Sequence, residues 1–200
     1  MKKVSLLLGA LLILSTVAFG QALTQADRER AAKYLQQTSD GVVAATKGLS
    51  DAQMKFKSAS DRWSVAETLE HIALAEEFIL QNVTDKIMKA PAGTADRDTA
   101  KTDATVLAMV PDRSHKAQAP PELVPTGRWT PAETLDRFLK SRAKTIAFLE
   151  STLDLREHVA DSPLGQPMDA YEWMLFIAAH SERHTKQILE VKADPNFPKN

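Results

Sequence analysis

Three of the five histidines in the chain have a spacing that suits metal binding. His180 and His184 are four residues apart, so they lie one turn above the other if this region is helical. They interrupt an apolar stripe with steps of three and four residues, made of Trp173, Ile177, Ile188 and Val191. Such a stripe is typical of a buried helix face. The pair is therefore predicted to point inward, where two imidazoles could hold one ion.

A third histidine, His71, falls on the core-facing side of another predicted helix, together with Leu74 and Phe78. An imidazole from a facing helix would complete a set of three neutral ligands and leave one coordination position for water or substrate. The alternative interpretation is that these histidines are ordinary core residues. The remaining two, His115 in a proline-rich segment and His158 in a charged stretch, are predicted to be solvated.

Glu67 is the one candidate for a catalytic group, because it lies one turn before His71 and could orient a ligand or act as a base. Its spacing from Ser64 also matches a capping box, in which each side chain bonds the backbone amide of the other residue. Glu133 repeats this pattern with no histidine beside it, so capping alone accounts for Glu67. Glu182 lies between the paired histidines in sequence and is predicted to face solvent.

Four long helices are predicted to carry these residues. Ala, Leu, Glu, Lys and Gln dominate the chain after its first twenty residues, glycine is scarce, and no segment alternates as a strand does. The predicted helices are Thr24–Thr46, Ser64–Lys89, Thr130–Leu153 and Asp169–Lys192. The fold class is therefore all-α, a four-helix bundle.

The second and third predicted helices begin with nearly the same sequence. Residues 62–70 read RWSVAETLE and residues 128–136 read RWTPAETLD. The match is either an internal repeat or two uses of one good helix start, and Trp63 and Trp129 are predicted to pack at these starts. At the position of His71 the second copy has Arg137, which favours a specific role for the histidine.

About forty residues, 90–129, separate these two helices and contain five prolines. So long a connection predicts a crossover rather than a simple up-down-up-down order. A short helix is expected near residues 105–110. Long connections of this kind are where functional lids occur.

The first twenty residues resemble a secretory signal peptide. Lys2 and Lys3 precede a short apolar run that ends in Ala18-Phe19-Gly20, a small-x-small pattern. We therefore expect residues 1–20 to be removed and residues 21–200 to form one exported domain, periplasmic or secreted. No later run is apolar enough to span a bilayer, so no membrane association is expected after cleavage.

Composition limits the partners and the ligands. Loss of the two lysines shifts the formal net charge from −1 to −3, and a mildly acidic chain has no electrostatic footprint for nucleic acid. Because the chain has no cysteine, a metal site must use imidazole and carboxylate ligands.

The pattern Trp63-Ser64-x-x-Glu67-x-x-x-His71, followed about a hundred residues later by His180-x-x-x-His184, resembles the DinB-like family of DNA-damage-inducible, metal-dependent proteins. The resemblance covers about residues 23–191. It implies a four-helix bundle whose ligands are His71, His180 and His184, binding one divalent ion such as zinc or nickel. It also implies frequent homodimers. Some members of the family are metal-dependent transferases that use low-molecular-weight thiols, and one is a thiol-dependent isomerase. The predicted export separates this chain from those cytosolic thiols.

Three functions remain open at this point. The first is a metal-dependent hydrolase or transferase that acts on a small molecule through the open coordination position. The second is a non-catalytic metal-binding module, in which the ion joins two helices or is itself the cargo. The third is an interaction protein whose histidines are core residues.

Overall fold

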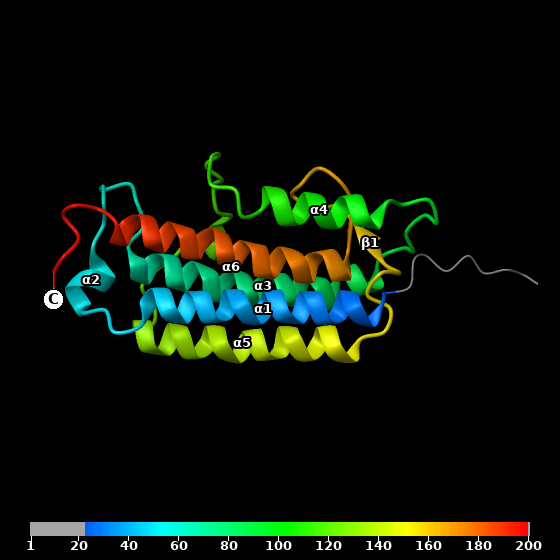
Figure 1. Ribbon diagram of the computed structural model, residues 1–200, viewed down its shortest axis with the longest axis horizontal. Helices are drawn as coiled ribbons and strands as arrows, with labels where there is room; N and C mark the ends of the chain where they lie inside the picture. Colours follow the sequence, from blue (N-terminus) through cyan, green and yellow to red (C-terminus); the bar gives the residue numbers. More distant parts are fainter. Residues whose placement is uncertain (1–22, 200) are drawn as a thin grey trace, which may run out of the picture.

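The computed structural model describes residues 23–199, and the predicted signal peptide lies outside them. Four long helices form a bundle (Figure 1). They are α1 (Gln25–Thr46), α3 (Val65–Asp85), α5 (Pro131–Ser151) and α6 (Ala170–Lys192). The all-α prediction is thus confirmed, and these helices begin and end within three or four residues of the predicted limits.

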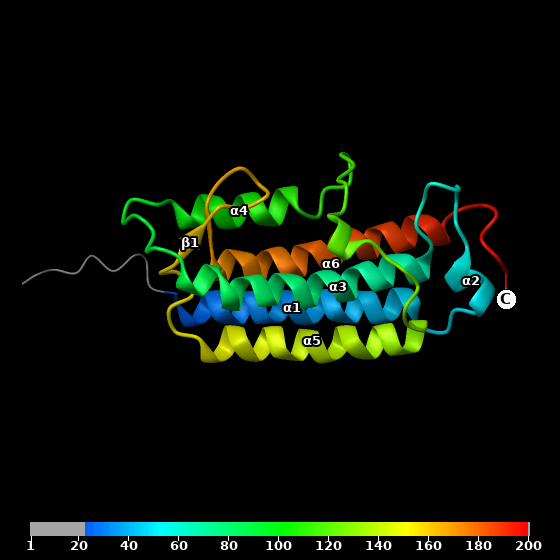
Figure 2. The same ribbon diagram turned by 180° about the vertical axis from the view of Figure 1, so that it is seen from behind.

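Two of the three connections between the long helices join helices at opposite corners of the bundle, namely α1 to α3 and α5 to α6. α1 packs against α6 and α5, and α3 packs against the same two helices, so the consecutive helices α1 and α3 occupy opposite corners. The colours, which follow the sequence, show that α1 and α6 run in one direction and that α3 and α5 run in the other (Figures 1 and 2). Because α3 and α5 are parallel, the chain has to return along the bundle between them. The prediction of a crossover is therefore correct.

Side-chain caps set where the long helices begin. Thr24, Ser64, Thr130 and Asp169 each accept a hydrogen bond from the amide three residues on, and the acidic residue there bonds back to the cap amide. These reciprocal bonds satisfy donors that the helix itself leaves unpaired. The repeated starts at Ser64 and Thr130 therefore form the same local structure, as predicted.

The smaller elements depart from the predictions. The short helix α2 (Asp51–Lys55) was not predicted, and α4 (Thr99–Met109) begins six residues before the expected helix. A minimal sheet was not indicated by the sequence: β1 (Val159–Ala160) pairs antiparallel with β2 (Met168–Asp169). Two-residue strands are too short to produce an alternating pattern. Two single 3₁₀ turns follow α3: η1 (Ile87–Lys89) lies just after the helix, and η2 (Pro121–Leu123) lies in the crossover.

A buried arginine joins all four long helices. Arg142 of α5 is 2% exposed and donates from Nε and Nη2 to both carboxylate oxygens of Glu76 in α3, each at 2.7 Å. Its Nη1 donates to the Leu35 carbonyl and to Thr38 Oγ1 of α1, and its Nη2 donates to Ser181 Oγ of α6. All five guanidinium N–H donors therefore have an acceptor.

A second buried ionic cluster holds the crossover against the start of α6. Arg97, just before α4, pairs with Asp169 and Glu172, and Arg156 pairs with Asp103 of α4 and with the same two acids. Burial, with the neighbouring Asp169 carboxylate as the next cause, raises the pKa of Glu172 to about 8. The cluster fixes one end of α4 on the bundle, while Met109 at the other end is exposed.

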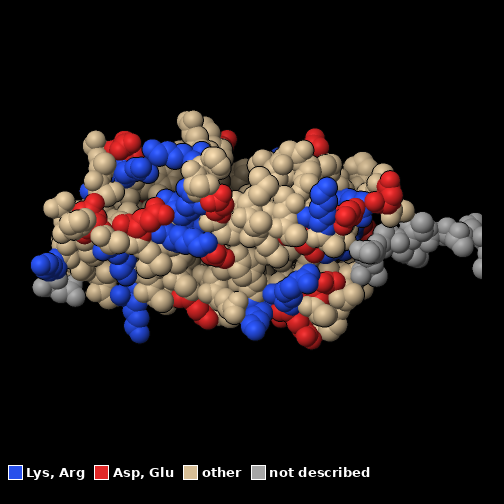
Figure 3. Space-filling model, turned by 45° about the horizontal axis from the view of Figure 1, so that its top comes forward, with Lys and Arg blue, Asp and Glu red and all other residues tan. Residues whose placement is uncertain are grey.

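The face that carries the crossover has charges of both signs. Basic and acidic side chains lie side by side in groups on this face, and uncharged surface separates the groups (Figure 3). This face therefore presents no field of a single sign. Among the residues that the structure describes, no helix combines the length and apolar character needed to cross a membrane.

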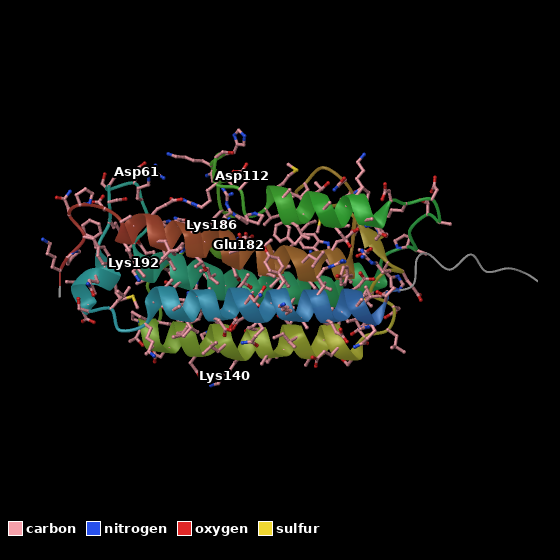
Figure 4. All side chains as sticks on the ribbon, viewed as in Figure 1. Asp61, Asp112, Lys140, Glu182, Lys186 and Lys192 are labelled. Carbon is pink, nitrogen blue, oxygen red and sulfur yellow. The ribbon has the colours of Figure 1, made fainter. Side chains whose placement is uncertain are left out.

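The arginine clamp predicts a large and local effect on stability. Arg142→Ala would leave the Glu76 charge buried without its partner, which costs about 3–5 kcal/mol. Lys140→Ala on the same helix is the matched control. Lys140 pairs with Asp136 on the exposed side of α5 (Figure 4), so its loss should cost at most about 1 kcal/mol. Urea unfolding of both variants measures this, and equal losses would contradict the assigned role of Arg142.

Candidate metal centre

The structure brings His71, His180 and His184 together, as predicted. The Nε2 atom of His71 lies 3.3 Å from Nε2 of His180 and 3.2 Å from Nε2 of His184. One ligand nitrogen from each of the three lies within 4.8 Å of those of the other two. His71 and His184 are buried and His180 is half-buried, so the cluster is open mainly on the His180 side.

The crossover and α6 fix which nitrogen of two rings carries the hydrogen. Nδ1 of His71 lies 2.8 Å from the carbonyl oxygen of Leu123 in η2, and Nδ1 of His184 lies 2.9 Å from Oε1 of Gln187. Both partners are acceptors, so each Nδ1 must donate. In a neutral imidazole the other nitrogen, Nε2, then has a lone pair and no hydrogen.

These lone pairs fit a bound cation. Two acceptor nitrogens 3.2 Å apart with no hydrogen between them repel each other, so the arrangement calls for a positive centre. Ligands at about 2.0–2.1 Å from a tetrahedral ion lie about 3.3 Å from each other, which matches the separations from His71 to the other two rings. Three imidazoles and no thiolate suit zinc, nickel, copper or iron(II).

Electrostatics keep the three rings neutral. Burial lowers the pKa of His71. The pKa of His180 is also lowered, by its desolvation against the bundle and by the neighbouring His184 and His71. Burial, followed by the neighbouring His71, lowers the pKa of His184 to about 3. Neutral imidazole is the form that ligates metal, so all three rings can bind an ion at neutral pH.

Further contacts fix the ring of His71. The Trp63 ring packs at 4.8 Å from it, measured between centroids. The preceding residue, Glu70, is buried and accepts from the backbone amides of Thr126 and Gly127 at 3.1 and 2.8 Å. Gly127 has φ +69°, a conformation that glycine adopts without strain. Glu70 therefore holds the end of the crossover whose Leu123 carbonyl orients His71.

Other sequence-based assignments have mixed outcomes. The Glu67 carboxylate bonds the Ser64 amide and the Lys57 ammonium, at 2.8 and 2.7 Å, so its capping role is observed. Glu182 is half-buried because Tyr34 of α1 donates to it, so the prediction that it faces solvent holds only in part. His115 is exposed, as predicted.

The prediction that His158 is an ordinary solvated residue holds only in part, because its side chain is partly exposed but also bonded to the crossover. The turn before β1 folds it back on the crossover, where its Nδ1 lies 2.7 Å from the Ala90 carbonyl oxygen. With Asp154 and Glu157 it forms a second group of potential ligands, this one of one histidine and two carboxylates. This group lies at the surface, and its contact with residue 90 explains the histidine without a ligand.

The residues that orient the ligands were missed at the level of sequence. Leu123 acts through its backbone carbonyl, which leaves no signature in residue type. Gln187 had a detectable signal, because it lies three residues after His184 and so on the same helix face.

Comparison with known proteins gives a family match. The family model of the DinB superfamily matches residues 22–188. The uncharacterized protein YuaE of Bacillus subtilis (strain 168) is 25% identical over 148 residues, which cover 73% of this chain and 87% of that protein.

A solved structure shares the fold. YfiT from Bacillus subtilis, described as a probable metal-dependent hydrolase with an unusual four-helix bundle topology, superimposes with a TM-score of 0.56 and 13% sequence identity. The match covers 89% of this chain and 93% of that one. At this identity the similarity supports the arrangement of the helices.

The lowered pKa of His184 predicts how the stability of the metal-free protein depends on pH. Below the ordinary histidine pKa of 6.5 the unfolded chain takes up a proton that the folded His184, with a pKa of about 3, does not. The free energy of unfolding should therefore fall on acidification, by up to about 1.4 kcal/mol per pH unit from this residue. Urea unfolding between about pH 7 and pH 5, on wild type and His184→Gln, tests this. The variant should lose less stability, whereas parallel curves would contradict the assignment.

Proposed function

Because the chain belongs to the DinB superfamily, we propose that it binds one divalent metal ion through His71, His180 and His184 and acts as a metal-dependent hydrolase on a small molecule. The observation that carries the proposal is the 3.2 Å separation of the Nε2 atoms of His71 and His184, each of which has a lone pair and no hydrogen. The description of YfiT as a probable metal-dependent hydrolase supports the same class of activity. Zinc and nickel are the ions expected first.

The protein's own residues would prepare the site in three ways. The Leu123 carbonyl and the Gln187 amide hold two ligand rings in the tautomer that binds metal. The aromatic ring of Trp63 covers His71 and keeps water from that side. His180 is the most exposed of the three, and the Phe176 ring lies nearly parallel to it at 6.2 Å between centroids. A substrate would therefore approach beside His180 and Phe176. The bound ion would supply Lewis acidity, which polarises a carbonyl group and activates water.

One observation favours a second candidate, a non-catalytic metal-binding module. The carboxylate proposed from sequence as a base, Glu67, is already held by Ser64 and Lys57. A metal site with no free carboxylate to act as a general base is consistent with an ion that serves only to join α3 to α6. A thiol-dependent transferase would use the same ligands, and a substrate panel separates these functions.

Metal content tests the site directly. Residues 21–200, purified without a histidine tag, should contain about one zinc or nickel ion per chain. His71→Ala and His180→Ala should lose it, because two imidazoles hold an ion far less tightly than three. His158→Ala serves as the control and should keep the ion. Elemental mass spectrometry makes the measurement, and ion-free wild type after reloading would refute the proposal.

Activity separates the candidates once the ion is present. The metal-loaded protein should hydrolyse members of a panel of esters, amides and lactones, and the His71→Ala variant should not. Turnover only with added low-molecular-weight thiol would identify a transferase. No turnover with any substrate, together with a melting temperature raised by the ion, would favour the non-catalytic module.

We also propose that the protein is exported. The basic start and short apolar run of residues 1–20 support cleavage after Gly20. Cell fractionation followed by N-terminal sequencing should find a periplasmic or secreted protein that begins at Gln21. An uncleaved cytosolic chain would contradict this.

A further inference from the structure

Gln187 connects a metal ligand to the crossover. Its Oε1 lies 2.9 Å from Nδ1 of His184 and 3.2 Å from Nη1 of Arg113. The Gln187 amide oxygen thus accepts one hydrogen bond from the His184 ring and another from Arg113, which lies outside the bundle. Arg113 belongs to the loop that follows α4, and Asp112 marks this loop above α6 (Figure 4).

Arg113 is itself held in place. Its Nε and Nη2 donate to the two carboxylate oxygens of Glu190, one turn further along α6, at 2.6 and 2.7 Å. Arg183 of α6 donates to the carbonyl oxygens of Asp112 and His115, so the same loop is tied to the helix by its backbone as well. The guanidinium of Arg113 therefore has a fixed position beside Gln187.

The identity of the Gln187 atom that faces His184 decides the tautomer of the ring. A glutamine amide can present its oxygen or its NH₂ group. A guanidinium has only donors, so the group facing Arg113 must be the oxygen. The same oxygen faces His184, whose Nδ1 must therefore carry the hydrogen, which leaves Nε2 free to bind metal. An NH₂ group in that place would favour the opposite tautomer, whose Nε2 carries a hydrogen.

We propose that Gln187 is a positioning residue for His184, that Arg113 holds Gln187 in the orientation the site requires, and that metal affinity is therefore coupled to docking of residues 110–115. This inference rests on the proposed metal-binding function. It assigns to the crossover a role in metal affinity rather than that of a passive connection. By the reciprocity of such coupling, metal binding should in turn hold the loop on α6.

The substitutions follow from this chain of contacts. Gln187→Met keeps the length of the side chain and removes the acceptor, so zinc affinity should fall by about 10–100-fold, the usual effect of losing such a partner. Gln187→Glu retains an acceptor and should restore affinity to within a few-fold. Arg113→Met should lower the affinity less than Gln187→Met does, and Arg113→Lys should recover part of the loss. Lys186→Met is the control, because Lys186 pairs with Glu182 and not with the site.

The experiment has two readouts on the untagged protein. Competition with a chromophoric chelator gives the zinc dissociation constant of each variant. Long-range ¹H–¹⁵N NMR of the imidazoles gives the tautomer of His184, with and without zinc. Wild type should show the hydrogen on Nδ1 in both states, and metal-free Gln187→Met should lose this preference. Hydrogen exchange of residues 110–115 should slow on adding zinc to wild type and change less in Gln187→Met. If Gln187 served folding alone, a variant with an unchanged melting temperature would show no change in zinc affinity, His184 tautomer or hydrogen exchange.

The outcomes separate this inference from the function on which it rests. If wild type binds no zinc, the proposed function fails. If wild type binds zinc, but Gln187→Met and Gln187→Glu bind it equally well and keep the same His184 tautomer, the function stands and the positioning role is wrong. If Gln187→Met unfolds, the Arg113→Met variant, whose change lies outside the bundle, provides the test. Unchanged zinc affinity and an unchanged His184 tautomer in Arg113→Met would overturn the coupling to the crossover.

Discussion

The buried guanidinium of Arg142 sets the register of the four long helices. A guanidinium is planar and its five donors point in fixed directions, so its acceptors must stand in one particular arrangement. Those acceptors come from α1, α3 and α6. Two of them are close in sequence to histidines of the proposed metal site. Glu76 follows His71 by five residues on α3, and Ser181 directly follows His180 on α6. The clamp therefore sets the relative height of the two ligand helices, and so the distance between His71 and His180.

The bundle supplies the ligands, and the crossover completes their orientation. The Leu123 carbonyl fixes His71, Glu70 holds the backbone that follows Leu123, and Arg113 fixes the side chain that orients His184. At its other end the segment is anchored by the buried ionic cluster around Arg97. The segment thus touches both ligand helices through hydrogen bonds rather than through apolar packing alone. Hydrogen bonds have strict directional requirements, so a small shift of the crossover would change the orientation of the His71 and His184 rings.

The sequence allowed the long helices and the grouping of the three histidines to be predicted, because both leave periodic signals. The apolar stripe of α6 continues through His180 and His184, and the caps at Ser64 and Thr130 repeat almost letter for letter. What could not be predicted depends on tertiary contacts. The Leu123 carbonyl has no counterpart in residue type. The two-residue strands and the bond from His158 to Ala90 exist only because distant segments meet. Gln187 lies between these cases, since its spacing from His184 was visible but the position of Arg113 was not.

The parallel course of α3 and α5 has a consequence for chain length. After α3 the chain must travel back over a helix of 21 residues, about 31 Å at 1.5 Å per residue. In extended form that distance takes about ten residues. The chain between the two helices runs from Lys86 to Thr130, several times that length. Most of the connection is thus surplus to the topology, and the surplus forms α4, the loop with Arg113 and the turn with Leu123. A relative with a minimal connection would keep the bundle and its three histidines but would have to orient two of them by other means.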